Sequence, residues 1–360
     1  MSIENEITDV RDAKDFRTLT ISGYKKSEVK KELINNLCES NIEPSCYWSA
    51  ELICSGYFID LWDILINFYT KHIHIGSPML AMHLERRIND FKNVVTTGFV
   101  ENELLMRNNK KIRQLFAEIV SIFCVTSKKH KLEEVKMNPE YFDMTNITNK
   151  LHAPDISYAA IVFKEDDPKE VFVAMNELSY TLSNKHGDVL MACFWVEWIM
   201  EYKKIKVKQK NPCVCERRFI SCVNEKYQKE LDWIIWELLI KRAEMKRDKR
   251  IVNIVKALHS IYNLKYSPST SYKKRKYVVY FALSLVSEDV FISSQILSES
   301  NKTEVKNICS SIDNIYKQVK EREQGSATDY LFVGLNKNLE DTVDKLEKMK
   351  DFSTQFTPRI

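Results

Sequence analysis

The sequence predicts an all-α protein, and three observations support that prediction. Only 7 glycines and 8 prolines occur in 360 residues, fewer than the turns of an all-β or nucleotide-binding α/β fold would need. Apolar residues recur at helical spacing through most of the chain, most clearly over 110–125. Four apolar blocks also occur twice in the same order, which is typical of a duplicated helical core.

Helical patterning begins after an irregular lead-in of residues 1–26, in which 16–21 alternates like a short edge strand. Within 110–125 the apolar positions recur at steps of three and four, which places them on one helix face. The dipeptide Ser77-Pro78 has the pattern of an N-cap followed by proline at the first helical position. The first half is therefore predicted to contain helices over 27–37, 46–53, 59–69, 78–95 and 110–125.

A polar connector over 127–157 separates the halves, and Asn138 within it marks the start of a short helix. Asp167, Pro168 and Glu170 have the spacing of a capping box, with Asp167 as the N-cap. Further helices are predicted over 169–183, 188–202, 226–246, 250–264 and 277–287, then over 301–323 and 338–350.

The recurring blocks predict two related helical halves, 27–157 and 158–300, followed by a charged helical C-terminal extension and tail over 301–360. About 27 extra residues, around 203–228, interrupt the second copy, and about 35, around 72–106, interrupt the first. Insertions into repeats often lie on the binding face, so we expect function in these two inserts. The matched blocks are 32–37 with 177–182, 46–53 with 193–200, 62–66 with 236–240, and 112–123 with 251–262.

Four tryptophans, Trp48, Trp62, Trp195 and Trp236, occupy matched positions in these blocks. Stacking platforms for nucleic-acid bases would be exposed and interleaved with charge, which these apolar blocks lack. We therefore interpret the four residues as core aromatics that pack helix against helix.

The cysteines and histidines do not predict a metal or cofactor. The 9 cysteines have no disulfide-framework spacing, which is typical of reduced thiols. Cys213, Cys215 and Cys222 form a cluster without the paired C-x₂₋₄-C spacing of a zinc site, so packing or surface thiols are favoured and zinc stays the alternative. His72 and His74 would face one way on an extended segment, but turn or core histidines are the favoured interpretation.

Catalytic motifs are absent from the sequence. It contains no G-x-S-x-G, no P-loop and no G-x-G-x-x-G, and the spacing of Cys46, His83 and Asp90 does not support a triad. We expect no enzymatic activity and no small-molecule substrate, with an enzyme of unrecognised site as the least favoured alternative.

The strongest functional signal is a charge asymmetry. Residues 203–276 contain 21 Lys and Arg against 7 Asp and Glu, while the rest of the chain has a net charge of −10. Clustered cations neutralise phosphates, so we expect a basic face that binds nucleic acid or an acidic partner. A solvated face, or self-association of basic and acidic faces, explains the same asymmetry. The predicted binding residues are Lys203, Lys204, Lys206, Lys208, Lys210, Arg217, Arg218, Lys246, Arg247, Lys249, Arg250, Lys273, Lys274, Arg275 and Lys276.

Membrane targeting is not expected. The segment 1–14 is acidic and polar, unlike a secretory signal, and the longest apolar run, 277–286, is half of what a bilayer span needs.

Two resemblances extend this interpretation. The segments FRTLTISGYKK (16–26), CYWSAEL (46–52), KHIHIG (71–76), FKEDDP (163–168) and WIIW (233–236) resemble an uncharacterised protein family of nucleocytoplasmic large DNA viruses. Within 33–82, CYWSAE and IGSPML (75–80) resemble the helical collar of clamp-loader-like replication ATPases. Because the Walker motifs are missing, the second resemblance implies only an oligomerising helical module.

Together these observations predict a non-enzymatic helical interaction or scaffold protein that acts beside nucleic acid in replication, transcription or genome packaging. The alternative is a virion structural protein that binds other proteins. The viral resemblance implies a location in the viral factory of the host cytoplasm or in the virion.

Overall fold

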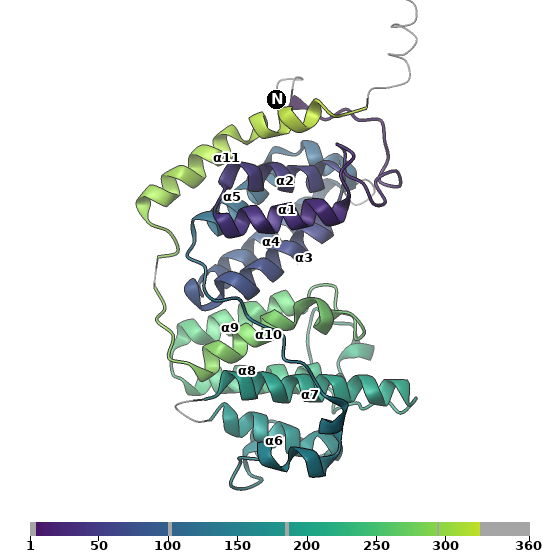
Figure 1. Cartoon of the computed structure of the whole chain (residues 1–360), viewed down its shortest axis with the longest axis vertical. Helices are drawn as coiled ribbons and strands as arrows, with labels where there is room; N and C mark the ends of the chain where they lie inside the picture. Colours follow the sequence, from purple (N-terminus) through teal and green to yellow (C-terminus); the bar gives the residue numbers. More distant parts are fainter. Residues whose placement is uncertain (1–4, 100–102, 184–186, 294, 325–360) are drawn as a thin grey trace, which may run out of the picture.

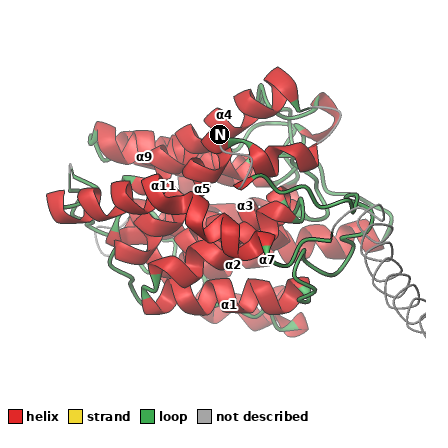
Figure 2. Cartoon of the chain, turned by 90° about the horizontal axis from the view of Figure 1, so that it is seen from above, coloured by secondary structure: helices red, strands yellow, loops and turns green. Residues whose placement is uncertain are grey.

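The computed structural model describes four stretches of the chain, 5–99, 103–183, 187–293 and 295–324. Throughout these stretches the all-α class is confirmed: helices form the regular structure, and no strand occurs (Figure 2). The segment 16–21, expected as an edge strand, makes only an isolated bridge between Leu19 and Lys25. The helix expected over 338–350 lies outside the described residues.

The first half is a helical bundle centred on α2 and α5. Helices α1 and α5 pack on α2, and α4 packs on α5. The apolar stripe predicted for α5 is the buried face, with Ile112, Phe116 and Phe123 inside, and the Asn109 side chain caps its first turn. The helices are α1 (Lys26–Glu39), α2 (Ile42–Cys54), α3 (Phe58–Phe68), α4 (Leu80–Gly98) and α5 (Lys110–Val125).

The segment between α3 and α4 differs from the prediction. Helix α3 runs on into a π-helical turn, Tyr69–Ile73, so His72 and His74 lie on a tight turn instead of an extended segment. The predicted Ser77-Pro78 cap is wrong, because α4 begins at Leu80 with no side-chain cap.

The second half is built around α10, which packs on α7, α8 and α9. Its apolar run is buried from Val278 to Ser287, which is why this run is not a membrane span. Asp188 caps α7 and Asp248 caps α9, each through a carboxylate that accepts backbone N–H groups of the first turn. The helices are α6 (Phe172–Thr181), α7 (Val189–Lys208), α8 (Asp232–Met245), α9 (Lys249–Tyr262) and α10 (Ser271–Ser287).

Short helical turns connect these elements, among them the one predicted to start at Asn138, whose side chain accepts the Glu140 N–H. The 3₁₀ turns are His74–Gly76, Glu103–Asn108, Pro139–Phe142, Met144–Lys150, Tyr158–Ile161, Lys169–Val171 and Glu225–Tyr227.

After α10 the chain returns to the first half. Helix α11 (Glu299–Lys320) crosses over and packs on α2 and α5 (Figure 1). Ile312 and Tyr316 of α11 are buried, and Asp313 pairs with the buried Arg113 at 3.0 Å. The described part of the predicted C-terminal extension therefore completes the core of the first half.

The two halves meet through α3 and α4 on one side and α9 and α10 on the other (Figure 1). Lys274 Nζ lies 2.9 Å from an Asp63 carboxylate oxygen across this junction. Lys71 Nζ donates to the Tyr277 hydroxyl at 2.9 Å and lies 4.3 Å from its ring centroid. The junction is thus a helix-on-helix contact with polar links.

The internal duplication is not confirmed. The matched blocks all lie on helices, but the structure pairs these helices differently. In the first half α2 packs on α5, whereas α9, the counterpart of α5, packs on α8, α10 and α4.

Candidate nucleic-acid interface

The fifteen predicted binding residues lie towards opposite ends of the second half. Lys246 Nζ donates to the Glu288 carbonyl oxygen at 2.5 Å, which places the turn 246–250 at the C-terminal end of α10. The run 273–276 lies in the first turns of the same helix. This run lies 11 to 14 residues before Ser287, so at about 1.5 Å per residue the two runs are about 20 Å apart.

The start of α10 lies against α7. Glu197 of α7 accepts a hydrogen bond from the Tyr272 hydroxyl at 2.8 Å and lies 3.3 Å from Lys276 Nζ. Beyond this contact α7 projects past the neighbouring helices (Figure 1). Its last turns and the start of α10 form a surface that we call the lysine end, made of Lys204, Lys206, Lys208, Lys210, Lys273 and Lys274.

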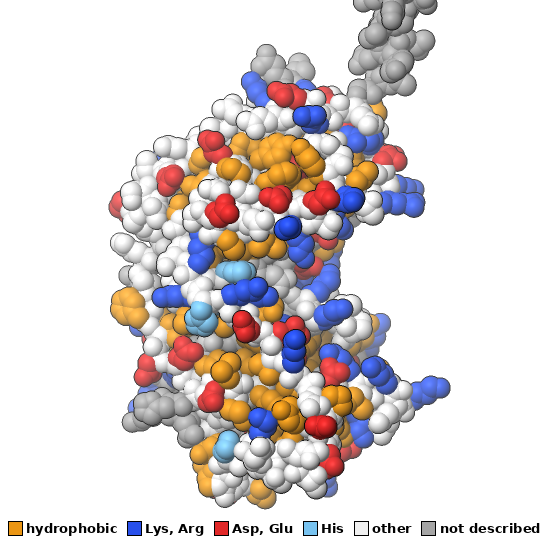
Figure 3. Space-filling view, viewed as in Figure 1, with side chains coloured by type: hydrophobic (Ala, Val, Ile, Leu, Met, Phe, Trp, Pro, Cys, Tyr) orange, Lys and Arg blue, Asp and Glu red, His pale blue; other side chains and the backbone are white. Residues whose placement is uncertain are grey.

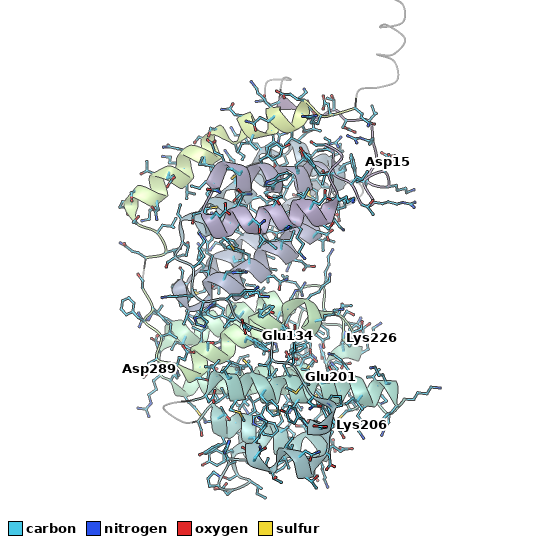
Figure 4. All side chains as sticks on the ribbon, viewed as in Figure 1. Asp15, Glu134, Glu201, Lys206, Lys226 and Asp289 are labelled. Atoms are coloured by element: carbon cyan, nitrogen blue, oxygen red, sulfur yellow. The ribbon has the colours of Figure 1, made fainter. Side chains whose placement is uncertain are left out.

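Figure 4 shows the separation of the two ends. Lys206 and Lys226 lie at one edge of the second half, and Asp289 lies at the opposite edge. On the side of Lys206 the molecule is hollowed between its two halves, with Lys and Arg side chains on both margins (Figure 3). The lysine end therefore faces a concave surface suited to an elongated anionic partner.

Arg218 is a structural residue at the centre of a buried network. Its guanidinium forms two bonds with Asp167, of 2.6 and 2.7 Å, and one with Glu237 of 2.9 Å. It also donates to the carbonyl oxygens of Glu216 and Val162, so all five N–H groups are used. This network joins the insert 203–228 to α8 and to the segment before α6.

The predicted capping box is therefore wrong. The Asp167 carboxylate accepts the N–H groups of Lys164 and Glu216 together with the Arg218 bonds. The turn Lys169–Val171 begins without a side-chain cap.

Lys203 is likewise internal. Its ammonium lies 2.6 Å from an Asp232 oxygen and 2.8 Å from a Glu230 oxygen, and Asp232 also accepts the Tyr262 hydroxyl at 2.5 Å. Burial alone would lower the pKa of Lys203, but the two carboxylates raise it above its ordinary value. Lys203 therefore stays charged inside the protein and is not available to a partner.

Three more predicted residues are held within the chain. Lys276 pairs with Glu134 at 2.6 Å as well as with Glu197. Arg275 donates to the carbonyl oxygens of Tyr262 and Leu264. Lys246, as shown above, bonds at the end of α10. Five of the fifteen cations thus support the fold: Lys203, Arg218, Lys246, Arg275 and Lys276.

The other ten differ in how free they are. Four pair with a nearby carboxylate: Lys204 with Glu201, Arg217 with Glu225, Arg250 with Asp248, and Lys274 with Asp63. Lys206 lies over the Tyr202 ring. The remaining residues are exposed, and their side chains make no ion pair or hydrogen bond with the described part of the chain; they are Lys208, Lys210, Arg247, Lys249 and Lys273.

The tryptophans lie where the apolar pattern predicts. Trp62, Trp195 and Trp236 are buried, and Trp48 is half-buried beside Tyr24 and Tyr47. All four tryptophans face protein on most sides, which favours packing over base stacking as their role.

The cysteine cluster does not converge. Cys222 is exposed, Cys213 is half-buried, and the buried Cys215 thiol lies 3.2 Å from the Glu230 carbonyl oxygen. Burial raises the pKa of Cys215 to about 12, which disfavours the thiolate that a metal needs. Over the described ranges, no group of three or more His, Cys, Asp or Glu side chains is placed to hold a metal ion.

Both predicted histidines are structural. His72 stacks on Phe68 with ring centroids 5.0 Å apart, and Nε2 of the buried His74 lies 2.8 Å from the His130 carbonyl oxygen. Burial lowers the pKa of His72 to about 4, so the ring is neutral at physiological pH.

The basic runs in the sequence do not include two cations that the tertiary structure places at the junction. Lys92 of α4 and Lys265, between α9 and α10, line one cavity there, although 173 positions separate them. Each is a single lysine without basic neighbours in sequence, so charge runs alone do not identify them.

Comparison of the chain with protein-family models, with curated proteins and with solved structures finds no match. None of the helices in the described stretches is both long and apolar enough to span a bilayer. The geometry of the lysine end is therefore the basis for any functional argument.

Proposed function

We propose that this protein is a non-enzymatic binding protein that holds nucleic acid against the lysine end and the adjoining hollow. The observation that carries the proposal is the projecting end of α7 (Figure 1), which contains Lys206 and Lys208 and is followed by Lys210. Exposed lysines without carboxylate partners are available to phosphates, and the counterions that the nucleic acid releases when its phosphates are neutralised favour association. The resemblance to viral proteins supports a role in genome replication, transcription or packaging, in the host cytoplasm or the virion.

Neutralising the lysine end is expected to weaken binding. The variant Lys208→Gln, Lys210→Gln, Lys273→Gln removes three exposed charges and no described contact. Each lost phosphate contact lowers the slope of log K against log salt by about 1, so we expect a decrease of about 3 and at least about tenfold weaker binding at low salt. Fluorescence anisotropy with labelled DNA and RNA over a salt series measures both quantities.

A matched control is available elsewhere on the surface. Lys30, Lys31 and Lys110 are also exposed and unpaired with described residues, and none of them is a predicted binding residue, so their triple Gln variant has the same net charge. It should bind as the wild type does. Equal weakening in both variants indicates a general charge effect, and no complex at low salt with the wild type overturns the proposal. Changing Arg275 or Lys276 is unsuitable, because both are internal.

A further inference from the structure

A cavity of about 190 Å³ lies at the junction of the two halves. Helices α3 and α4 form one wall, and the end of α9 with the start of α10 forms the other. Cys222 of the 203–228 insert and Phe91 of the 72–106 insert both line it. We call this cavity the junction pocket, and both inserts in which function was expected reach it.

Three buried polar atoms in the lining of the junction pocket have no hydrogen-bond partner among the described residues. They are the indole N–H of Trp62, the side-chain carbonyl oxygen of Asn263 and the Nε–H of Arg275. These residues are only 7%, 6% and 8% exposed, so water does not readily satisfy them. An unsatisfied buried polar group costs about 1–3 kcal/mol, so a cluster of three indicates a site that a ligand completes.

No comparable cluster lines the larger open cavity between α4, α5 and α11. That cavity has a volume of about 750 Å³, but among the described residues that line it Arg87 Nε is the one unpartnered buried polar atom. The cavity between α4, α5 and α11 is therefore the larger of the two. The junction pocket has more unsatisfied hydrogen-bonding groups, which makes it the better candidate for a ligand site.

The walls of the junction pocket define the ligand. Trp62 and Phe91, with ring centroids 5.7 Å apart, give one wall an aromatic and apolar character. The opposite wall contributes Asn263, whose amide nitrogen lies 3.4 Å from His259 Nε2. At the rim, Lys92 and Lys265 are exposed and unpaired with described residues, while the one carboxylate in the lining, Asp63, is already paired with Lys274.

We propose that the junction pocket binds one nucleotide, with the base between the two walls and the phosphate near Lys92 and Lys265. A base has apolar faces for the aromatic wall and an edge with both donors and acceptors, which matches two N–H groups and one carbonyl oxygen. An aliphatic carboxylate would leave Asn263 without a donor. A volume of about 190 Å³ is below the usual 300–1,000 Å³ of drug-sized ligands and suits a single ring system.

The nucleotide has two sources, a free nucleotide or an unpaired base of a strand. In the second case the inference rests on the proposed function and refines it to single-stranded nucleic acid, because a paired base cannot enter a pocket without leaving the duplex. If the ligand is a free nucleotide, the inference does not depend on the proposed function, and the expectation that no small molecule binds would be wrong.

The test uses Asn263→Leu, which removes the acceptor at nearly constant size. Calorimetry with AMP, GMP, CMP and UMP tests the free source, and anisotropy with a strand of about 16 nucleotides and its duplex tests the strand source. We expect the wild type to bind either a free monophosphate or the single strand. Asn263→Leu should bind that same ligand about tenfold more weakly, while its affinity for the duplex should stay unchanged. Lys92→Gln with Lys265→Gln should weaken the same ligand.

The control is Asn253→Leu, a change at an exposed position on the same helix α9. It should leave every affinity unchanged. If no monophosphate binds up to millimolar concentration, and if Asn263→Leu leaves any single-strand binding intact, the pocket proposal is overturned. The proposed function fails separately, when the wild type binds no strand or duplex at low salt.

Discussion

Asp167→Ala is expected to lower the free energy of unfolding by about 3–5 kcal/mol, because this carboxylate holds the buried guanidinium of Arg218. Removing one partner of a buried ion pair leaves the other charge unpaired in a region that water does not reach. Here that charge is Arg218, which is 7% exposed, directs two N–H groups at the lost carboxylate and would keep only the half-buried Glu237 as an anionic partner. Urea or thermal unfolding followed by circular dichroism measures the loss.

Two companions test the cause. Asp166→Ala changes the exposed neighbouring carboxylate and should cost less than about 0.5 kcal/mol. Asp167→Ala with Arg218→Met removes both charges and should be less destabilising than Asp167→Ala alone, because no buried ion is left unpaired. A loss below about 1 kcal/mol in the single variant would contradict the network described for Arg218.

The same pair predicts a dependence on pH. Burial raises the pKa of Asp167, but hydrogen bonds from Arg218 and from the backbone N–H groups of Lys164 and Glu216 outweigh it and hold the pKa below its ordinary value. The stabilisation is therefore present above the unfolded-state pKa of about 3.9 and is lost as pH falls through the folded-state pKa. The difference between wild type and Asp167→Ala should be constant down to about pH 5 and shrink below about pH 4. A constant difference at still lower pH excludes this linkage.

Trp195→Ala is expected to cost about 3–5 kcal/mol, because a fully buried indole leaves a cavity that its neighbours cannot fill. Its matched partner Trp48 is half-buried, so Trp48→Ala should cost about 1–2 kcal/mol. Chemical denaturation of the two variants compares these losses directly. Equal losses of unfolding free energy would mean that burial does not determine how much the two tryptophans stabilise the fold. Weaker nucleic-acid binding by folded Trp48→Ala would indicate that Trp48 stacks on bases.

Several elements could be predicted from local pattern alone. The stripe of α5 and the helix start at Asn138 depend on residues within one or two helical turns, so spacing is sufficient to identify them. Asp167 had the same local signature as a cap, yet its partners Glu216 and Arg218 lie about 50 positions away. The charged hydrogen bonds to Arg218 are stronger than a helix-capping hydrogen bond, so the Asp167 side chain pairs with Arg218 and does not cap the local turn.

The basic runs show that local pattern is also insufficient to predict which residues bind a partner. Their composition predicts cationic surface, but Lys203, Arg275 and Lys276 face carboxylates from other helices and are internal. Lys92 and Lys265 line the same pocket only because α4 packs on α9. Charge counts in sequence do not include the partners that folding supplies.

The sequence by itself determined that this chain is all-α, which residues form the helical core, and that its positive charge is concentrated in one region. These properties follow from spacing within single helices and from composition. Tertiary structure alone decided that α11 completes the first half, that five cations are internal, and that Trp62, Asn263 and Arg275 surround one pocket. The physical reason is that burial, pairing and cavities depend on which helices pack together, and contacts between distant segments leave no period in the sequence.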